Sequence, residues 1–167
     1  MKKVIKELLP YIIIIVVVTL IRTYIATPVI VVGDSMLPTL KEGNILLLNK
    51  LNYKLSEIER YDVVVVKIKK EELIKRIIGL PGEHIEYKDN VLYINNEKLE
   101  NKYNFITEDF KLEEICDCNK IPEDKYLVLG DNRGNSLDSR SKIIGLVDKK
   151  YIKGSTKISI WPIKKVK

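Results

Sequence analysis

The sequence is poor in the side chains on which many active sites depend. It contains one histidine, His84, and two cysteines, Cys116 and Cys118, which are separated by a single aspartate. Two thiols do not supply the four ligands of a structural zinc site, and residues this close in sequence rarely reach good disulfide geometry with each other. We therefore expect two non-catalytic thiols, with redox sensitivity or intermolecular pairing as alternatives, and neither a metal nor a cofactor.

The sequence also contains only one long apolar run. Residues 8–21 carry no charge, but a helix of this length covers only about 20 Å of a hydrocarbon layer roughly 30 Å thick. If Arg22 extends its guanidinium to the headgroups, the apolar span continues to Ala26. The sequence predicts a transmembrane anchor over 8–26, with residues 1–7 in the cytoplasm and 27–167 outside, because lysines precede the run at Lys2, Lys3 and Lys6.

A cleaved signal peptide is the alternative interpretation of this N-terminus. Ala26 could end such a peptide, but Tyr24 would then occupy a position where a small side chain is required, which favours an uncleaved anchor. The net charge of +6 accompanies scattered lysines rather than a basic-aromatic motif, so we expect a membrane partner and no nucleic acid. The tail around Trp161 suits either the membrane interface or a last strand packed in the core.

The remainder of the chain favours strands over helices. Short runs of β-branched residues recur, and helical periodicity is almost absent. Asn95-Asn96 is typical of a two-residue hairpin turn, because asparagine tolerates positive φ. We expect one mainly β domain built on an antiparallel sheet, with a small β insertion over 88–122. The expected strands are 29–32, 45–48, 62–68, 73–78, 84–87, 91–94 and 126–129.

Three segments carry candidate chemistry. The first, Gly33 to Leu40, places Ser35 in a turn-prone stretch shortly after the anchor, and a serine needs a base to become a good nucleophile. The second, Leu73 to Glu83, contains Lys75 and Arg76 among aliphatic residues, and in a strand these two cations point to opposite faces. One of them should be held against apolar side chains, and burial of Lys75 would favour the neutral amine that acts as a base.

The third segment, Leu129 to Arg140, is unusually dense in polar groups. It contains Ser136, two carboxylates and two arginines, more than turn chemistry alone requires. Each of the three segments also has an ordinary interpretation, namely a surface turn, a lysine with its head in water, and a solvated loop. A triad based on His84 is a further alternative.

In order and context the three segments, with Arg60-Tyr61-Asp62 between them, resemble the bacterial type I signal peptidases. The resemblance covers the anchor and nearly the whole external part. It implies that Ser35 is the nucleophile and a backbone oxyanion donor, Lys75 the general base, and Ser136 the hydroxyl that orients this lysine. It further implies structural roles for Asp131, Arg133, Asp138 and Arg140, and a pocket for small side chains formed by Val29, Val31, Val65 and Ile74.

The sequence departs from the family pattern at three positions. Gly33 stands where some members have a serine, Tyr61 replaces a usual glycine, and Gly134 stands where many have aspartate. None of these is a position of the expected dyad. The departure at Gly33 removes a side-chain donor from the expected oxyanion hole.

The resemblance implies a membrane-bound serine endopeptidase that removes signal peptides from exported preproteins after a small-x-small motif. Its partners would be preprotein signal peptides and membrane lipid, close to the secretion translocon, at the outer face of a bacterial cell membrane with one membrane pass. Alternatives are a peptidase dedicated to one secretion system, a self-cleaving Ser-Lys protein, and a non-catalytic membrane-tethered β domain that binds a partner.

Overall fold

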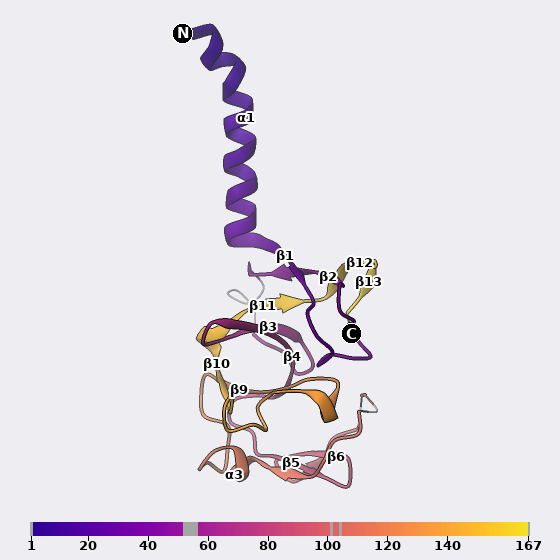
Figure 1. Cartoon of the computed structure of the whole chain (residues 1–167). Helices are drawn as coiled ribbons and strands as arrows, with labels where there is room; N and C mark the ends of the chain where they lie inside the picture. Colours follow the sequence, from indigo (N-terminus) through magenta and orange to yellow (C-terminus); the bar gives the residue numbers. More distant parts are fainter. Residues whose placement is uncertain (1, 52–56, 101, 104, 167) are drawn as a thin grey trace.

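The computed structural model describes residues 2–51, 57–100, 102–103 and 105–166. Helix α1 (Lys2–Leu20) continues into a π-helical turn, η1 (Ile21–Ile25), and then into strand β1 (Ala26–Ile30). The segment Glu7–Ile25 has a mean hydropathy of 2.3 and is long and apolar enough to cross a membrane. Figure 1 shows this helix standing away from the β domain. The helical part ends at Ile25, and β1 pairs with β2 from Ala26 onward.

The main sheet is antiparallel, which confirms the architecture predicted from the sequence. Its strands follow the order β10-β9-β4-β3-β11-β2-β12-β13, and β1 pairs with β2 outside this path. Every pairing in it is antiparallel. Two 3₁₀ turns accompany the sheet, η2 (Arg133–Asn135) and η3 (Lys149–Tyr151). The strands are β2 (Ile45–Asn49), β3 (Val63–Ile68), β4 (Glu71–Gly79), β9 (Lys125–Leu129), β10 (Val147–Asp148), β11 (Ile152–Thr156), β12 (Ile158–Trp161) and β13 (Lys164–Lys165).

A second, smaller sheet has the order β7-β6-β5-β8. Its strands are β5 (Ile85–Lys88), β6 (Val91–Ile94), β7 (Glu97–Lys98) and β8 (Phe110–Lys111), followed by a short helix, α3 (Leu112–Ile115). Asn95 and Asn96 have φ of 52° and 68°, as a tight hairpin turn requires. The second sheet thus begins at Ile85, before the first residue of the insertion expected from the sequence.

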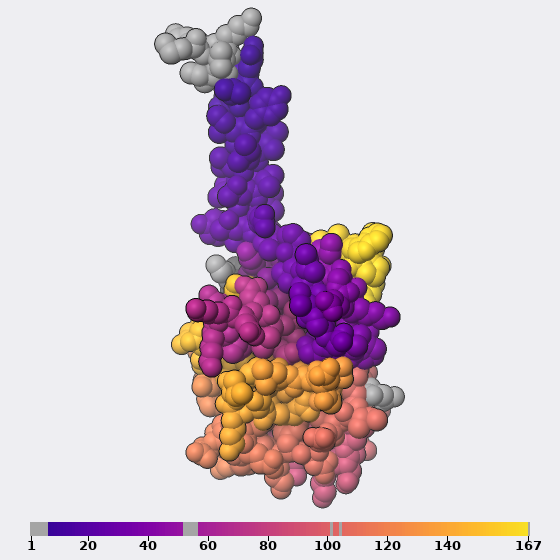
Figure 2. Space-filling model, in the orientation of Figure 1, coloured from indigo at the N-terminus to yellow at the C-terminus, as the bar shows by residue number. Residues whose placement is uncertain are grey.

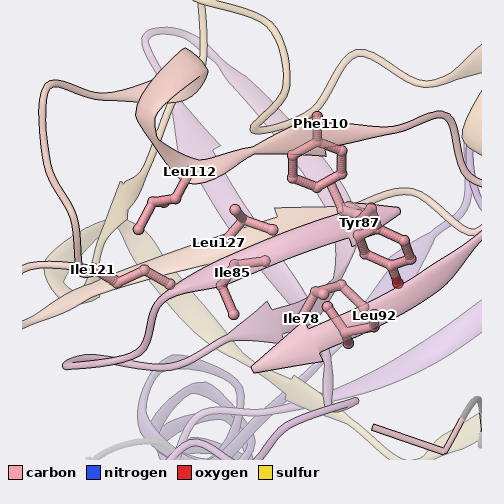
Figure 3. Packing of buried hydrophobic residues seen from close by; sticks show 9 residues of the cluster. Ile78, Ile85, Tyr87, Leu92, Phe110, Leu112, Ile121 and Leu127 are labelled. Carbon is pink, nitrogen blue, oxygen red and sulfur yellow. The ribbon is translucent and has the colours of Figure 1, made fainter. Parts of the chain in front are cut away.

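Buried apolar residues join the two sheets. Ile78 and Leu127 of the main sheet pack against Ile85, Tyr87 and Phe110 of the second sheet, as Figure 3 shows. A separate cluster lies under the segment that contains Ser35, and it includes Val31, Met36, Leu40, Leu46, Val63 and Val166. Removal of this apolar surface from water holds the Ser35 segment on the sheet.

The structure corrects one expectation about the rest of the chain and decides between two alternatives for Trp161. Cys116 and Cys118 form a disulfide rather than two thiols. A tight turn, in which the Cys118 N–H donates to the Cys116 carbonyl at 2.7 Å, brings their Cα atoms to 5.2 Å, within the usual range for a disulfide. Trp161 does not pack in the core, because 68% of its surface is exposed. The tail that carries it covers the domain beside the foot of the helix in Figure 2.

Candidate active site

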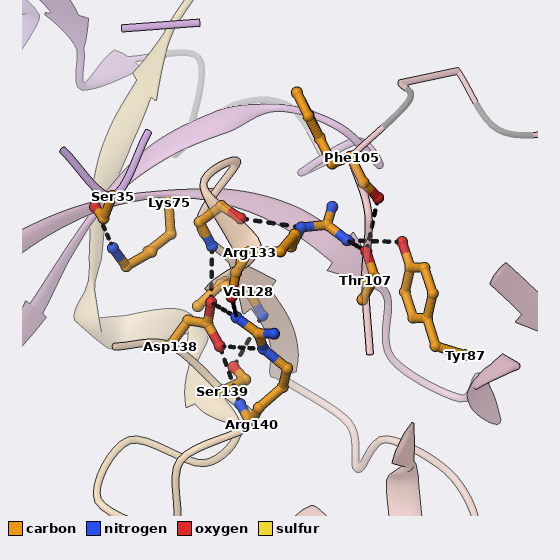
Figure 4. A network of polar contacts seen from close by, with 11 residues as sticks. Ser35, Lys75, Tyr87, Phe105, Thr107, Val128, Arg133, Asp138, Ser139 and Arg140 are labelled. Carbon is orange, nitrogen blue, oxygen red and sulfur yellow. Dashed lines mark hydrogen bonds and ion pairs between the residues drawn. The ribbon is translucent and has the colours of Figure 1, made fainter. Parts of the chain in front are cut away.

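Ser35 and Lys75 meet although 40 positions separate them in the chain. Lys75 lies in the middle of β4, where it pairs with Val64 of β3, and Ser35 lies in the turn-rich segment between β1 and β2. The Nζ atom of Lys75 is 2.6 Å from Oγ of Ser35, and Figure 4 shows this hydrogen bond. The expected dyad therefore has direct contact between its two members.

The surroundings of Lys75 favour the neutral amine. Only 2% of the residue is exposed, and burial lowers its pKa from 10.5 to about 8, because water no longer solvates the ammonium ion. Asp138 and Asp131 act in the opposite direction, and Arg140 lowers the pKa further. Each of the two aspartates is paired with an arginine, which offsets the attraction between its carboxylate and the ammonium form of Lys75.

Arg76, the neighbour of Lys75, is also fully buried. The sequence led us to expect burial of only one of these two cations, and the structure corrects this because β4 is covered on both faces. Nε and Nη2 of Arg76 donate to the two carboxylate oxygens of Asp131 at 2.8 and 2.6 Å. A paired, hydrogen-bonded carboxylate is what makes a buried guanidinium tolerable. This ion pair fastens the third segment to the strand of Lys75.

The third segment also contacts the segment that contains Ser35 directly. The Asn132 N–H donates to the Ser35 carbonyl at 3.0 Å, and its side-chain amide donates to the Asp34 carbonyl at 3.1 Å. Gly130 lies so close that a Cβ atom there would stand 2.5 Å from the Ser35 carbonyl oxygen and 2.1 Å from Oγ of Ser136. Only glycine allows this approach. Sequence analysis had given no role to Gly130 or Asn132, although both lie inside the polar segment.

The remaining charged residues of the third segment are linked by hydrogen bonds and an ion pair. Asp138 accepts a hydrogen bond from the Gly130 N–H at 3.0 Å and forms an ion pair with Arg140 at 2.9 Å. Arg140 also donates to the carbonyl of Arg133 at 2.6 Å. Arg133 donates to the Gly130 carbonyl at 3.0 Å and to the Tyr87 hydroxyl at 3.1 Å, so it ties the segment to the second sheet.

The hydroxyl of Ser136 is buried and has no hydrogen-bond partner among the described residues. The lysine-orienting contact expected for it is therefore absent from this geometry, in which the hydrogen bond of Lys75 goes to Ser35. An unpaired buried hydroxyl is costly and calls for a partner. Its role in holding Lys75 stays a prediction.

The four expected pocket residues line one cavity together with Ser35. This cavity has a volume of about 180 Å³, and Val29, Val31, Val65 and Ile74 contribute to its wall. The cavity is smaller than the roughly 300 Å³ or more that drug-sized ligands occupy, and its wall is mainly aliphatic. The structure thus brings Ser35 and an aliphatic pocket together.

The backbone around Ser35 offers one donor for an oxyanion. The Ser35 N–H has no hydrogen-bond partner in the described part of the chain. Gly33 has φ of +79°, a conformation that side chains disfavour, although no atom lies within 4 Å of the place where its Cβ would be. A serine at this position would therefore carry backbone strain.

The structure also shows the conformation of Tyr61 and the surroundings of His84. Tyr61 adopts φ of +73°, so the substitution of the usual glycine leaves a tyrosine in the left-handed region. His84 does not contact Ser35, since its Nε2 lies 3.1 Å from Oε1 of Glu113. Among the described residues there is no group of three or more histidine, cysteine or acidic side chains able to hold a metal ion.

Comparison with known proteins agrees with this geometry. Residues 3–161 match the family described as signal peptidase, peptidase S26. The chain is 39% identical to signal peptidase I of Bacillus caldolyticus over 93% of this chain and 90% of the relative. It is 38% identical to signal peptidase IB of Staphylococcus aureus over 97% and 94% of the two chains.

A solved structure is similar as well. The crystal structure of a signal peptidase I from Enterococcus faecalis is 35% identical in sequence and aligns with a TM-score of 0.53. The alignment covers 60% of this chain and 97% of that one. Together with the sequence matches, this similarity means that the chain belongs to the signal peptidase family, peptidase S26.

Proposed function

We propose that this protein is a membrane-anchored serine endopeptidase that removes signal peptides from exported preproteins after a small-x-small motif. The observation that carries the proposal is the 2.6 Å contact between Nζ of the buried Lys75 and Oγ of Ser35. Membership of the signal peptidase family supports the same activity. Among the residues that the structure describes, no contact favours self-cleavage or a purely binding role.

The proposed chemistry begins with neutral Lys75. The amine takes the proton of Ser35 as Oγ attacks the carbonyl carbon of the scissile peptide bond, and the Ser35 N–H donates to the oxyanion that forms. The ammonium of Lys75 then gives its proton to the leaving amine, and an acyl-enzyme remains. Water, activated by the neutral lysine, releases the signal peptide. A pKa of about 8 leaves about a tenth of Lys75 neutral at pH 7.

The aliphatic cavity beside Ser35 is proposed to hold the small side chains before the scissile bond. Val29 and Val31, which contribute to its wall, lie in and just after β1, whose pairing with β2 uses one edge of the strand. An extended substrate can add to a sheet edge through main-chain hydrogen bonds, with its alternate side chains in pockets.

We propose that the membrane positions the enzyme and its preprotein substrate relative to each other. Helix α1 leads within a few residues to β1 and then to Ser35, and the hairpin of β12 and β13 lies near the foot of the helix in Figure 1. Trp161 and Ile163 at this hairpin are exposed, which suits contact with lipid. We place the N-terminus in the cytoplasm and the β domain at the outer face of a bacterial cell membrane, close to the translocon.

Separate replacement of Ser35 by alanine and Lys75 by methionine tests the dyad. Each variant is purified in detergent and given a preprotein with an Ala-x-Ala site, and cleavage is followed by gel and mass spectrometry. Both are expected to lose activity at least about a thousandfold. Lys70→Met, an exposed lysine in the neighbouring hairpin turn, is the matched control and should cleave normally. Normal turnover by a folded dyad variant contradicts the mechanism, and no cleavage by the wild type favours a binding domain.

A further inference from the structure

A second cavity begins just beyond Ser35 in the chain. It is larger than the first, with a volume of about 560 Å³, and the two cavities share no lining residue. Its walls come from the Ser35 segment, from the third polar segment and from the stretch before β8. The lining residues are Leu37, Pro38, Phe105, Ile106, Glu108, Asp131, Asn132, Arg133, Gly134 and Arg140.

The two cavities take their walls from different segments. The first is lined by residues 29–33, by Ser35 and Met36, and by residues of β3 and β4. The second is lined by Leu37 and Pro38, by the polar segment and by the stretch before β8. Figure 1 shows the second sheet at the end of the domain away from α1. A peptide with its small residues in the first cavity and its scissile carbonyl at Ser35 must continue beyond the serine. The second cavity adjoins the segment that follows Ser35.

We propose that the second cavity binds the first residues of the mature protein, the segment that becomes the leaving group; this inference rests on the proposed function. Such a site gives the enzyme contacts on both sides of the scissile bond. Binding on both sides fixes the carbonyl against Ser35 and so reduces the entropic cost of the attack.

The lining indicates the chemistry of this segment. Ile106 is 83% exposed, and Leu37 and Pro38 extend the apolar surface beside it, so an apolar side chain of the substrate can be buried there. Arg133 is buried and has only neutral acceptors and aromatic rings as partners in the described chain. Its guanidinium favours peptide carbonyl groups and disfavours a basic side chain, while Glu108 on the rim is exposed and screened by water.

Two peptides with the same residues up to the scissile bond test the site. One ends in a single alanine amide after the bond, and the other continues for five residues with leucines near the bond. The full chain in detergent should cleave the longer peptide with the higher kcat/KM. Ile106→Ala should lower kcat/KM for the longer peptide by about three- to tenfold and leave the shorter one unchanged, because only the longer peptide reaches Ile106.

Ile143→Ala is the matched control, since Ile143 is also exposed but lies outside both cavities, and both peptides should be cleaved as by the wild type. Equal loss on both peptides, no loss on either, or a wild type that does not distinguish them overturns the second site. The peptidase proposal survives all three of these results. It fails, and the second site with it, if the wild type cleaves neither peptide.

Discussion

Replacing Lys75 with methionine is expected to make the protein more stable at pH 7 while it abolishes cleavage. The structure holds Lys75 at 2% exposure, and its pKa falls from 10.5 to about 8. This fall in pKa of about 2.5 corresponds to roughly 3.5 kcal/mol of differential interaction, at about 1.4 kcal/mol per pKa unit. Below pH 8 the folded protein carries this cost in full, because the ammonium must be held in a site that disfavours it.

The pH dependence follows from the sign of the shift. Between about pH 8 and 10.5 the unfolded chain binds a proton at Lys75 that the folded protein has lost, so this residue makes stability rise with pH. The variant lacks this group. Its advantage of at most about 3.5 kcal/mol at pH 7 should therefore shrink as the pH approaches 10.5.

Thermal unfolding of the full chain in detergent, followed by circular dichroism from pH 7 to 10, measures this difference. For a chain of this size about 3.5 kcal/mol raises the midpoint by roughly 7–14 °C at pH 7. Cleavage by the wild type should rise with pH through about 8, as the neutral base accumulates. A variant no more stable than the wild type at pH 7 would refute the argument that burial makes Lys75 a base, and a flat pH–activity profile would refute it independently.

Three other substitutions test the frame around the dyad. Gly130→Ala should lower cleavage at least tenfold in the reporter assay, because its Cβ would stand 2.5 Å from the Ser35 carbonyl oxygen; unchanged kinetics would show that the approach is not needed. Asp131→Ala should cost about 3–5 kcal/mol in thermal unfolding, because it leaves the Arg76 guanidinium buried without its carboxylate, and a loss under 1 kcal/mol would contradict this. Lys50→Met should slow cleavage of a preprotein in proteoliposomes more than that of a short peptide, because Lys50 binds carbonyl groups at the end of the membrane helix at 3.0 and 3.3 Å; an equal effect on both substrates would argue against a role in orienting the domain.

Local patterns were enough to predict much of the fold. Alternation and β-branched runs located the seven expected strands to within a few residues, but β11, which lies between β3 and β2, was not among them. Asn95-Asn96 marked a turn that the structure confirms with positive φ at both residues. The disulfide between Cys116 and Cys118 was missed, because a turn decides whether two nearby cysteines can meet. The exposure of Trp161 also depends on where the last hairpin lies.

The sequence by itself determined which residues are available for chemistry. A single histidine, a serine after the apolar run and a lysine among aliphatic residues directed attention to Ser35 and Lys75, since type and order along the chain are enough for a motif. Only the tertiary structure decided that Nζ of Lys75 lies 2.6 Å from Oγ of Ser35 and that Arg76 is buried as well as Lys75. The physical reason is that desolvation and ion pairing depend on which segments the sheet brings together, and strand register, not sequence distance, sets this.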